Sequence, residues 1–331
     1  VANALAPYGL AISAGDTTSV GVGGLILGGG IGWMVRKDGL ALDNVVAAEV
    51  VTADGRVVRA SADEHADLFW AIRGGGGNFG VVTTFDLTAR PVREVLFGTI
   101  SYPAAQTATA LRGWRDYLRT APDEVTTTAR IFPNFGGEQP PFTITVCYSG
   151  ADLDAGRAAL EPLFHLGTLI GNEVKAMPYA DVLEDANALP PGLVPMVKNR
   201  FARVCGDDLL DTAMNPDRPG MMFVEFRGLG GAMARVAPDA TAFAYRDVEV
   251  MVLTALLDPS PDAAAKFATF WESLAPFTAG AYGNFLTTAN ADDVASIYPP
   301  QTYARLAAIK HMYDPQNVFN HNHNIPPAAV G

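Results

Sequence analysis

The stretch Gly21-Val-Gly-Gly-Leu-Ile-Leu-Gly-Gly-Gly-Ile-Gly32 holds seven glycines in twelve residues, and a second cluster runs Gly74-Gly-Gly-Gly-Asn-Phe-Gly80. Glycine allows positive φ and lets a ligand come close to the main chain. Successive bare N–H groups can form an anion-binding nest suited to a pyrophosphate. Each glycine inside a regular element also costs roughly 0.5–1 kcal/mol relative to alanine. The clusters therefore indicate a nucleotide-type ligand held by loops, and a tightly packed structural corner is the alternative that stays open.

The second cluster contains a formal G-x-G-x-x-G at Gly75, Gly77 and Gly80. A dinucleotide-binding fingerprint needs a strand before these glycines and a helix after them. Here a helix is predicted before the cluster, opened by the capping box Ser61-Ala-Asp-Glu64, and a strand is predicted after it over 81–87. The order is reversed, which excludes a Rossmann site. The sequence also has no G-x-x-x-x-G-K-[ST], which excludes a P-loop.

Composition limits the classes of partner. The chain has 331 residues, 49% of them apolar, with a formal net charge of −12. This size predicts about two domains. The acidity argues against nucleic acid and against anionic membrane surfaces. We find no run of about 18 uninterrupted apolar residues, so no membrane span is predicted.

The ends and the cysteines say little about the compartment. The chain opens on Val1 without a basic segment and apolar stretch, so we predict no signal peptide and a cut or processed product. Cys147 falls in the alternating run 142–148 and is expected in the core, and Cys205 is the only other cysteine. Neither has metal-ligand spacing, and His321 and His323 have no acidic or cysteine partner, so no metal site is predicted. A cytoplasmic location is weakly favoured, and secretion stays open if an N-terminal segment was removed.

Periodicity predicts an α+β fold. An Asp54-Gly55 turn joins two β-rich arms over 45–58 in a hairpin. From about residue 96, helical and strand patterns alternate, which favours an antiparallel sheet covered by helices on one side. The predicted helices span 104–118, 154–164, 262–274 and 300–312, and the predicted strands span 126–131, 142–148, 222–227, 240–245 and 248–257.

A late segment, Ala281-Tyr-Gly-Asn-Phe285, carries the best candidates for chemistry. As a strand it would place Tyr282 and Asn284 on one face and Phe285 on the other, because strand side chains alternate. A phenol and an amide pointing together could orient a substrate oxygen or a ring carbonyl. The alternative is an ordinary buried tyrosine with a satisfied hydroxyl.

Several of these stretches together resemble one family. Residues 15–24, 28–32 and 39–45 resemble the second lobe of a vanillyl-alcohol-oxidase-type FAD-binding domain, and Asp67-Leu-Phe-Trp-Ala-Ile-Arg-Gly-Gly-Gly-Gly-Asn-Phe-Gly-Val-Val82 continues the match. Near the other end, Tyr313-Asp-Pro-Gln-Asn-Val-Phe319 and Asn324-Ile-Pro-Pro327 resemble the C-terminal signature of the berberine-bridge enzymes. The chain thus resembles the berberine-bridge-enzyme-like FAD-linked oxidases.

The resemblance implies an FAD-dependent oxidase. Such enzymes transfer hydride from a substrate C–H bond to flavin N5 and then pass the electrons to dioxygen, and the substrate here would be a small organic molecule or natural product. It implies three segments: an FAD-binding lobe over 1–95, a substrate-binding domain over 96–298 whose sheet roofs the flavin ring, and a C-terminal segment over 299–331 that returns to the FAD-binding lobe.

The resemblance also assigns site residues. Tyr282 and Asn284 become the catalytic candidates, with Tyr282 weakened as a candidate by the departures described below. The candidate cofactor-binding residues are Thr17, Thr18, Gly21, Gly23, Gly24, Gly28, Gly29, Gly30, Gly32, Asn78, Gly80, Val81, Val82 and Asn324.

Three departures from the family pattern accompany these assignments. The first FAD lobe, with its Arg-Gly-Gly-Gly-His-like loop and flavin-linked histidine, is expected to be missing, so a separately retained lobe is a candidate partner. Thr17 stands where some members have a second flavin-linked cysteine, and Leu25 stands where those members often have histidine. Phe285 replaces the tyrosine that some members use as a base. These departures leave a second hypothesis open, a catalytically silent ligand-binding or scaffold protein.

Overall fold

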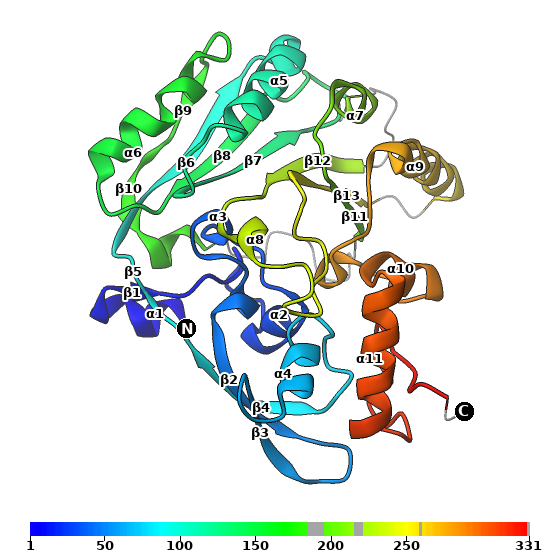
Figure 1. The fold of residues 1–331 in the computed structure, drawn as a ribbon. Helices are drawn as coiled ribbons and strands as arrows, with labels where there is room; N and C mark the ends of the chain where they lie inside the picture. Colours follow the sequence, from blue (N-terminus) through cyan, green and yellow to red (C-terminus); the bar gives the residue numbers. More distant parts are fainter. Residues whose placement is uncertain (135, 184–194, 215–220, 258–259, 330–331) are drawn as a thin grey trace.

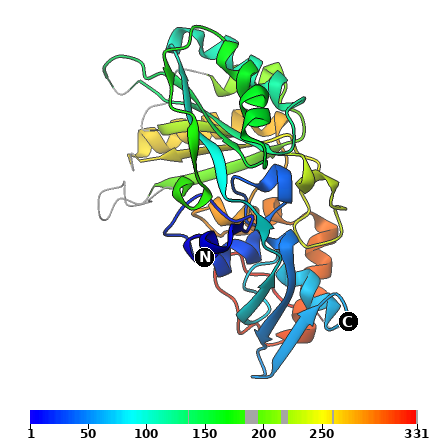
Figure 2. The ribbon, with the colours of Figure 1, turned by 90° about the vertical axis from the view of Figure 1, so that its left-hand side faces the viewer.

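A computed structural model describes the chain except residues 135, 184–194, 215–220, 258–259 and 330–331. Figures 1 and 2 show a large sheet unit above a smaller glycine-rich unit, and both chain ends lie in the smaller one. The large sheet has eight antiparallel strands in the order β10-β6-β8-β7-β12-β13-β11, with β9 beside β6. The strands are β6 (Glu94–Tyr102), β7 (Val125–Ile131), β8 (Phe142–Tyr148), β9 (Gly171–Asn172), β10 (Lys175–Pro178), β11 (Met196–Ala202), β12 (Met221–Gly228) and β13 (Val250–Leu256).

Helices cover one face of this sheet, which confirms the α+β prediction. They are α5 (Thr107–Leu118), α6 (Leu153–Leu160), α7 (Asp207–Ala213) and α9 (Pro261–Ser273). On α5, Leu111, Trp114 and Leu118 recur at helical spacing and are buried against the sheet. The indole N–H of Trp114 donates to Thr127 Oγ1 at 2.8 Å, so even this buried polar atom is paired. The apolar stripe of each helix therefore meets the apolar face of the strands.

The opposite face of the sheet is polar. Apolar and polar side chains alternate on β12, where Val224 and Phe226 point to the helices and Glu225 and Arg227 to the other side. Arg227 Nη1 lies 2.6 Å from Asp16 Oδ2, and Asp16 belongs to the glycine-rich unit. The polar face of the large sheet therefore faces the glycine-rich unit.

The glycine-rich unit is built on a three-stranded antiparallel sheet in the order β3-β2-β4. The Asp54-Gly55 turn, with Gly55 at φ 83°, joins β2 to β3 and confirms the predicted hairpin. The strands are β2 (Val45–Val51), β3 (Val57–Ser61) and β4 (Val81–Leu87), with a small separate pair of β1 (Leu10–Ala11) and β5 (Arg90–Pro91). The helices nearby are α1 (Ala2–Leu5), α2 (Val22–Gly28), α3 (Val35–Asp38), α4 (Ala66–Ile72) and, from the middle of the chain, α8 (Ala232–Arg235).

The C-terminal segment packs against the glycine-rich unit. It contains α11 (Pro300–Tyr313), and α10 (Ala291–Ile297) directly precedes it. Leu306 and Ile309 of α11 share a buried cluster with Leu68 and Phe69 of α4. No helix in the part of the chain that the structure describes is long and apolar enough to cross a membrane. The domain boundaries at 95 and 298 stay predictions.

Three local predictions were wrong. The helix after Ser61 begins only at Ala66, because Ser61 ends β3 and its Oγ accepts the N–H groups of a turn formed by Asp63 and Glu64. Residues 240–245 form no strand, because the Ala242 N–H donates to the Trp70 carbonyl at the end of α4 instead of to a sheet neighbour.

The third correction concerns the segment with the catalytic candidates. Residues Gly283–Phe285 form a 3₁₀ turn and not a strand. The side chain of Asn199 binds both the N–H and the carbonyl of Tyr282, at 2.7 and 2.9 Å, and so replaces a neighbouring strand. Phe285 consequently packs edge-on against Tyr282, with ring centroids 5.0 Å apart, and does not point to the other face.

Candidate functional site

Two adjoining pockets lie where the glycine clusters meet the C-terminal segment. We call them the glycine pocket, of about 360 Å³, and the tyrosine pocket, of about 270 Å³. They share Gly24 and Asn284. The glycine pocket is lined by Gly24, Leu27, Gly28, Gly74, Gly76, Gly77, Asn78, Gly283, Asn284, Ile297, Tyr298, Val318, Phe319, His321, Asn322 and His323. The tyrosine pocket is lined by Gly15, Asp16, Thr17, Val20, Gly21, Gly24, Leu25, Ile31, Tyr282, Asn284 and Phe285.

The side chain of Tyr282 lines the tyrosine pocket and contacts Asn284, which both pockets share. Its hydroxyl oxygen accepts the N–H of Gly30 at 2.8 Å and the Nδ2 group of Asn284 at 2.9 Å. Burial raises the pKa of Tyr282, and the two donated hydrogen bonds offset this only in part. With its oxygen already accepting, a neutral phenol can still donate its own proton. The predicted pairing of Tyr282 with Asn284 is therefore present, although a 3₁₀ turn produces it.

Part of the first glycine cluster is needed for packing around this pair. An added Cβ would stand 2.1 Å from Asn284 Oδ1 at Gly28 and 2.7 Å from the Tyr282 ring at Gly29. At Gly32 it would stand 1.5 Å from the carbonyl oxygen of Ala14. These glycines fit the packed-corner interpretation.

Four glycines of the two clusters have no such cause within the described residues. No atom of the described residues lies within 4 Å of the position that a Cβ would take at Gly21, Gly23, Gly24 or Gly77. Gly21 and Gly24 line the tyrosine pocket, and Gly24 and Gly77 line the glycine pocket. Bare backbone that faces open space in a pocket is what close approach of a phosphate-bearing ligand requires. Gly24 and Gly77, in the glycine pocket, therefore fit the pyrophosphate of a dinucleotide such as FAD.

A row of linked ion pairs extends from the tyrosine pocket to the large sheet. Asp16 accepts Thr17 Oγ1 at 3.0 Å and pairs with Arg227. Arg227 Nε then lies 2.5 Å from Glu225 Oε1, and the other oxygen of Glu225 binds Arg130. Burial pushes the pKa values of Asp16 and Glu225 upward, but the neighbouring guanidinium groups outweigh burial and leave both pKa values lowered. Both carboxyl groups are consequently ionised at neutral pH.

The C-terminal tail closes the glycine pocket through a second buried ion pair. Lys310 Nζ donates to Asp314 at 2.6 Å and to the carbonyls of Asn78 and Phe319, each at 2.7 Å. The Asn78 amide binds Gly75 O at 2.8 Å and the Ile325 N–H at 3.0 Å. The side chain of Asn78 thus ties the second glycine cluster to the tail. Asp314, which follows Tyr313, accepts hydrogen bonds from Lys310 and from the N–H groups of Val318 and Phe319.

The remaining predicted cofactor residues are spread around the two pockets. Thr18 is exposed in a turn, and Gly80 packs against Val51, whose carbonyl oxygen would lie 2.6 Å from an added Cβ. Val81 and Val82 lie on β4 outside both pockets. Gly30 packs against Ala41 and lines neither pocket. Asn324 lines a neighbouring pocket with Tyr303 and Pro326, and its Oδ1 is buried without a partner among the described residues.

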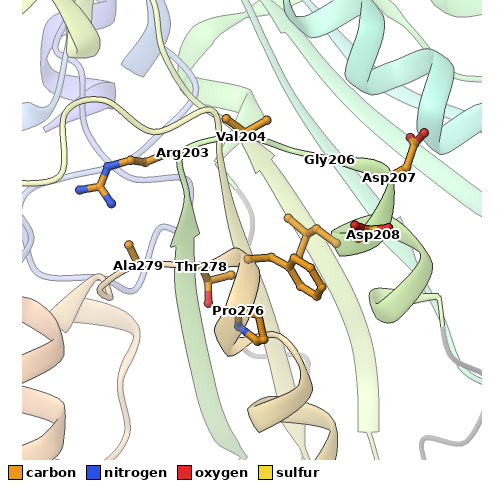
Figure 3. Close-up of a pocket in the computed structure, with 10 residues that line it drawn as sticks. Arg203, Val204, Gly206, Asp207, Asp208, Pro276, Thr278 and Ala279 are labelled. Atoms are coloured by element: carbon orange, nitrogen blue, oxygen red, sulfur yellow. The ribbon is translucent and has the colours of Figure 1, made fainter.

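A further pocket of about 480 Å³ lies away from the glycines (Figure 3). Its two charged ends are already paired, since Arg203 binds Asp247 and Asp207 binds Arg115. Figure 3 shows Arg203 and Asp207 at opposite ends of this pocket, pointing away from each other. Among the described residues, no cluster of three or more His, Cys, Asp or Glu side chains could hold a metal ion.

The sequence did not predict the linked charges of Asp16, Arg227 and Glu225 beside the tyrosine pocket. Asp16 precedes Thr17 in a stretch otherwise poor in charge, and Glu225 and Arg227 alternate with apolar residues on a predicted strand. That alternation signals a polar strand face. It does not reveal that Arg227 meets a residue 211 positions earlier.

Comparison with known proteins agrees with this geometry. Residues 1–61 match the family model of an FAD binding domain, and residues 281–326 match the model described as berberine and berberine like. The chain is 31% identical over 347 residues to (R)-6-hydroxynicotine oxidase of Paenarthrobacter nicotinovorans, a match that covers 97% of this chain and 74% of that protein.

Two further proteins extend the comparison. Glucooligosaccharide oxidase of Sarocladium strictum is 28% identical over 355 residues, covering 96% of this chain and 70% of that protein. The solved structure of 6-hydroxy-D-nicotine oxidase from Arthrobacter nicotinovorans has a TM-score of 0.84 and 29% identity, covering 99% of this chain and 76% of that one. These proteins are named as oxidases, two of them of 6-hydroxynicotine and one of glucooligosaccharides.

Proposed function

Because this chain belongs to the berberine-bridge-like family of FAD-linked oxidoreductases and is of the oxidase type, we propose that it oxidises a small organic substrate held in the tyrosine pocket, with dioxygen as the electron acceptor. The observation that carries this proposal is the convergence of open glycines from both clusters on two pockets that meet at Gly24 and Asn284, beside Tyr282.

The cofactor of this family is FAD, which when bound accepts hydride and passes electrons on. Around it, Gly24 and Gly77 of the glycine pocket would hold the phosphate-bearing part through bare backbone. The Lys310–Asp314 pair and the Asn78 amide keep the second cluster and the tail together around that part. The glycine pocket would therefore hold the phosphate-bearing part of FAD, and the tyrosine pocket would hold the substrate.

Tyr282 supplies a hydrogen-bond donor at the reacting end. Its oxygen is fixed by Gly30 N–H and by Asn284, so the direction of its own O–H is restricted. Because burial raises its pKa, it acts as a neutral donor and not as a base. A fixed donor of this kind orients a carbonyl or hydroxyl oxygen without reorganisation during the reaction.

The proposal is tested with the purified protein and added FAD. We expect flavin absorption bands that stay with the protein on gel filtration. We also expect bleaching of these bands by substrate under anaerobic conditions and hydrogen peroxide formation when air is admitted. A protein that retains FAD but is reduced by no compound in a broad panel of amines, alcohols and oligosaccharides would contradict the proposal and support a silent ligand-binding role.

A further inference from the structure

A pocket of about 430 Å³ lies at the free edge of the large sheet, and we call it the edge pocket. Strand β11 ends the sheet beside α9 and α10 (Figure 1). The edge pocket is lined by three consecutive residues of β11 and by residues of α9, of α10 and of the segment that joins these helices. None of them lines the glycine pocket or the tyrosine pocket, so the edge pocket is separate from the candidate flavin site.

Two positions on the free edge of β11 are covered by the chain itself. The Val197 N–H donates to Thr287 Oγ1 at 3.1 Å, and this hydroxyl donates to the Val197 carbonyl at 3.4 Å. At Phe201 the N–H and the carbonyl pair with the main chain of residues 279–280, at 3.2 and 2.7 Å. Alternate residues of an antiparallel strand turn their N–H and C=O groups to the same edge. The main-chain groups of Asn199, midway between the covered positions, therefore also point away from β13.

Asn199 is the uncovered position on this edge. The neighbouring segment turns at Gly280, whose φ of 59° lies in the left-handed region, and Tyr282 then meets the side chain of Asn199 and not its main chain. No described residue bonds the main-chain N–H or C=O of Asn199. Asn199 lines the edge pocket. An unpaired main-chain donor and acceptor at the wall of a pocket are binding groups for a ligand.

The side chains of the edge pocket add charges of both signs. Lys198 forms no ion pair with a described residue, and its Nζ lies over an aromatic ring of α9, 6.0 Å from the ring centre. Asp292, in the first turn of α10, likewise pairs with no described cation. Arg200 is already paired with Glu272 at 3.1 Å, and Asp293 accepts a main-chain N–H at 3.0 Å in the cap of α10. The edge pocket therefore keeps a free cation toward α9 and a free carboxylate toward α10.

We propose that the edge pocket binds a free α-amino acid with an apolar side chain. The Asn199 N–H would donate to the carboxylate of the ligand, with Lys198 as its counter-ion. The Asn199 carbonyl would accept the ammonium group, with Asp292 as its counter-ion. Hydrogen bonds to charged groups of this kind are stronger than those between neutral groups. The inference is independent of the proposed oxidation, because the two sites share no lining residue.

The same geometry limits the size of the ligand. A peptide added to the sheet as a strand would need open main-chain groups at several alternate positions of β11. Val197 and Phe201 are already covered, so the open edge has the length of one residue. Trp271, Ala275 and Leu286 line the edge pocket and supply apolar surface beside this opening. A single amino acid with an apolar side chain fits these limits, and a peptide does not.

Calorimetric titration of the purified protein tests the ligand class. The ligands are leucine, methionine and phenylalanine, together with leucinamide, which lacks the carboxylate, and N-acetylleucine, which lacks the ammonium group. We expect leucine to bind roughly 10-fold more tightly than either derivative, because each derivative has lost one charged hydrogen-bond partner. Equal binding of leucine and its two derivatives, or no binding of any of the three amino acids, overturns the proposal.

Three variants locate the binding. Lys198→Gln should weaken leucine binding roughly 10-fold and leave leucinamide binding unchanged, because leucinamide has no carboxylate for that cation. Asp292→Asn should weaken leucine binding by a similar factor and leave N-acetylleucine unchanged. Lys266→Gln is the control, since Lys266 lies on α9, pairs with Asp262 and does not line the edge pocket. Unchanged leucine affinity in Lys198→Gln or in Asp292→Asn, or an equal loss in Lys266→Gln, overturns the edge pocket as the amino-acid site.

Discussion

Gly24 and Gly28 belong to one run of sequence, but a methyl group would meet opposite surroundings at the two positions. At Gly28 it would stand 2.1 Å from Asn284 Oδ1, and at Gly24 no atom of the described residues lies within 4 Å. The same division holds in the second cluster. At Gly75 an added Cβ would stand 2.4 Å from the Ala71 carbonyl oxygen, and at Gly77 it would face open space.

This difference shows that one glycine-rich motif can have two physical causes. The packed glycines let Tyr282 and Asn284 come close to the backbone. The open glycines leave their backbone bare to a ligand. Treating every glycine of the motif as cofactor-binding, as the sequence prediction does, merges these two roles. Substitution by alanine can separate them, because stability and FAD affinity should respond to different members.

The largest effect is expected at Gly32. In Gly32→Ala the new Cβ would overlap the Ala14 carbonyl oxygen at 1.5 Å, and a backbone atom cannot move aside as a side-chain tip can. We expect unfolding in urea to show a loss of about 3 kcal/mol or more, or a protein that does not fold. Gly23→Ala is the control: it lies inside α2 in open space, and helix propensity should stabilise the chain by about 0.5–1 kcal/mol. Equal losses of stability in Gly32→Ala and Gly23→Ala would contradict the distinction between packed and open glycines.

The next effect tests what the packed glycines hold in place. Tyr282→Phe leaves the Gly30 N–H without its acceptor and removes one of the acceptors of Asn284 Nδ2, which also donates to the Leu25 carbonyl, and this should cost about 1–3 kcal/mol of stability. It should also slow flavin reduction, since the oriented donor is lost. Tyr245→Phe is the control, because that hydroxyl binds the Ser296 carbonyl at 2.9 Å and lies outside both pockets. Tyr245→Phe should lower stability without changing the rate of flavin reduction. If Tyr245→Phe and Tyr282→Phe slow reduction equally, the role of Tyr282 is structural.

Local pattern predicted much of the fold. Strict alternation located β8, and helical spacing of apolar residues located α5. Strand β6 was not predicted because Gly98 interrupts it. That glycine is explained by a contact far along the chain: an added Cβ there would meet the Glu173 carbonyl oxygen at 2.4 Å. Strand β11 contains the consecutive polar residues Lys198, Asn199 and Arg200, so its sequence lacks the alternation that would predict a strand. Its neighbouring strand stabilises it instead.

The site was predictable where residue chemistry was local and not where it was assembled by the fold. Tyr282 and Asn284 are two residues apart, and a phenol beside an amide indicated a shared role. The pairing of Asp16 with Arg227 joins residues from two units, and no periodicity encodes it. The sequence likewise could not sort packed from open glycines, because that depends on what stands opposite each one.

A smaller effect is expected in ligand binding at Gly24. Gly24→Ala should leave the folded protein as stable as the original, since nothing in the described chain crowds the new methyl group. The methyl group would stand in the shared part of both pockets, so FAD affinity should fall about tenfold, which is about 1.4 kcal/mol. Fluorescence titration with FAD checks this. Unchanged affinity would mean that the open glycines of the first cluster do not contact the cofactor.

The smallest effect separates backbone strain from crowding in the second cluster. Gly76 has φ +68° and Gly77 does not lie in the left-handed region, yet an added Cβ has open space at Gly77 and only the tip of Asn78, at 3.9 Å, near Gly76. Gly76→Ala should therefore cost about 1 kcal/mol of stability from strain alone, and Gly77→Ala should cost almost none. Both line the glycine pocket, so both should weaken FAD binding by a similar few-fold factor. If stability changes at Gly77 as much as at Gly76, the loop is packed more tightly than its open surroundings indicate, and the division between the two kinds of glycine stops at the first cluster.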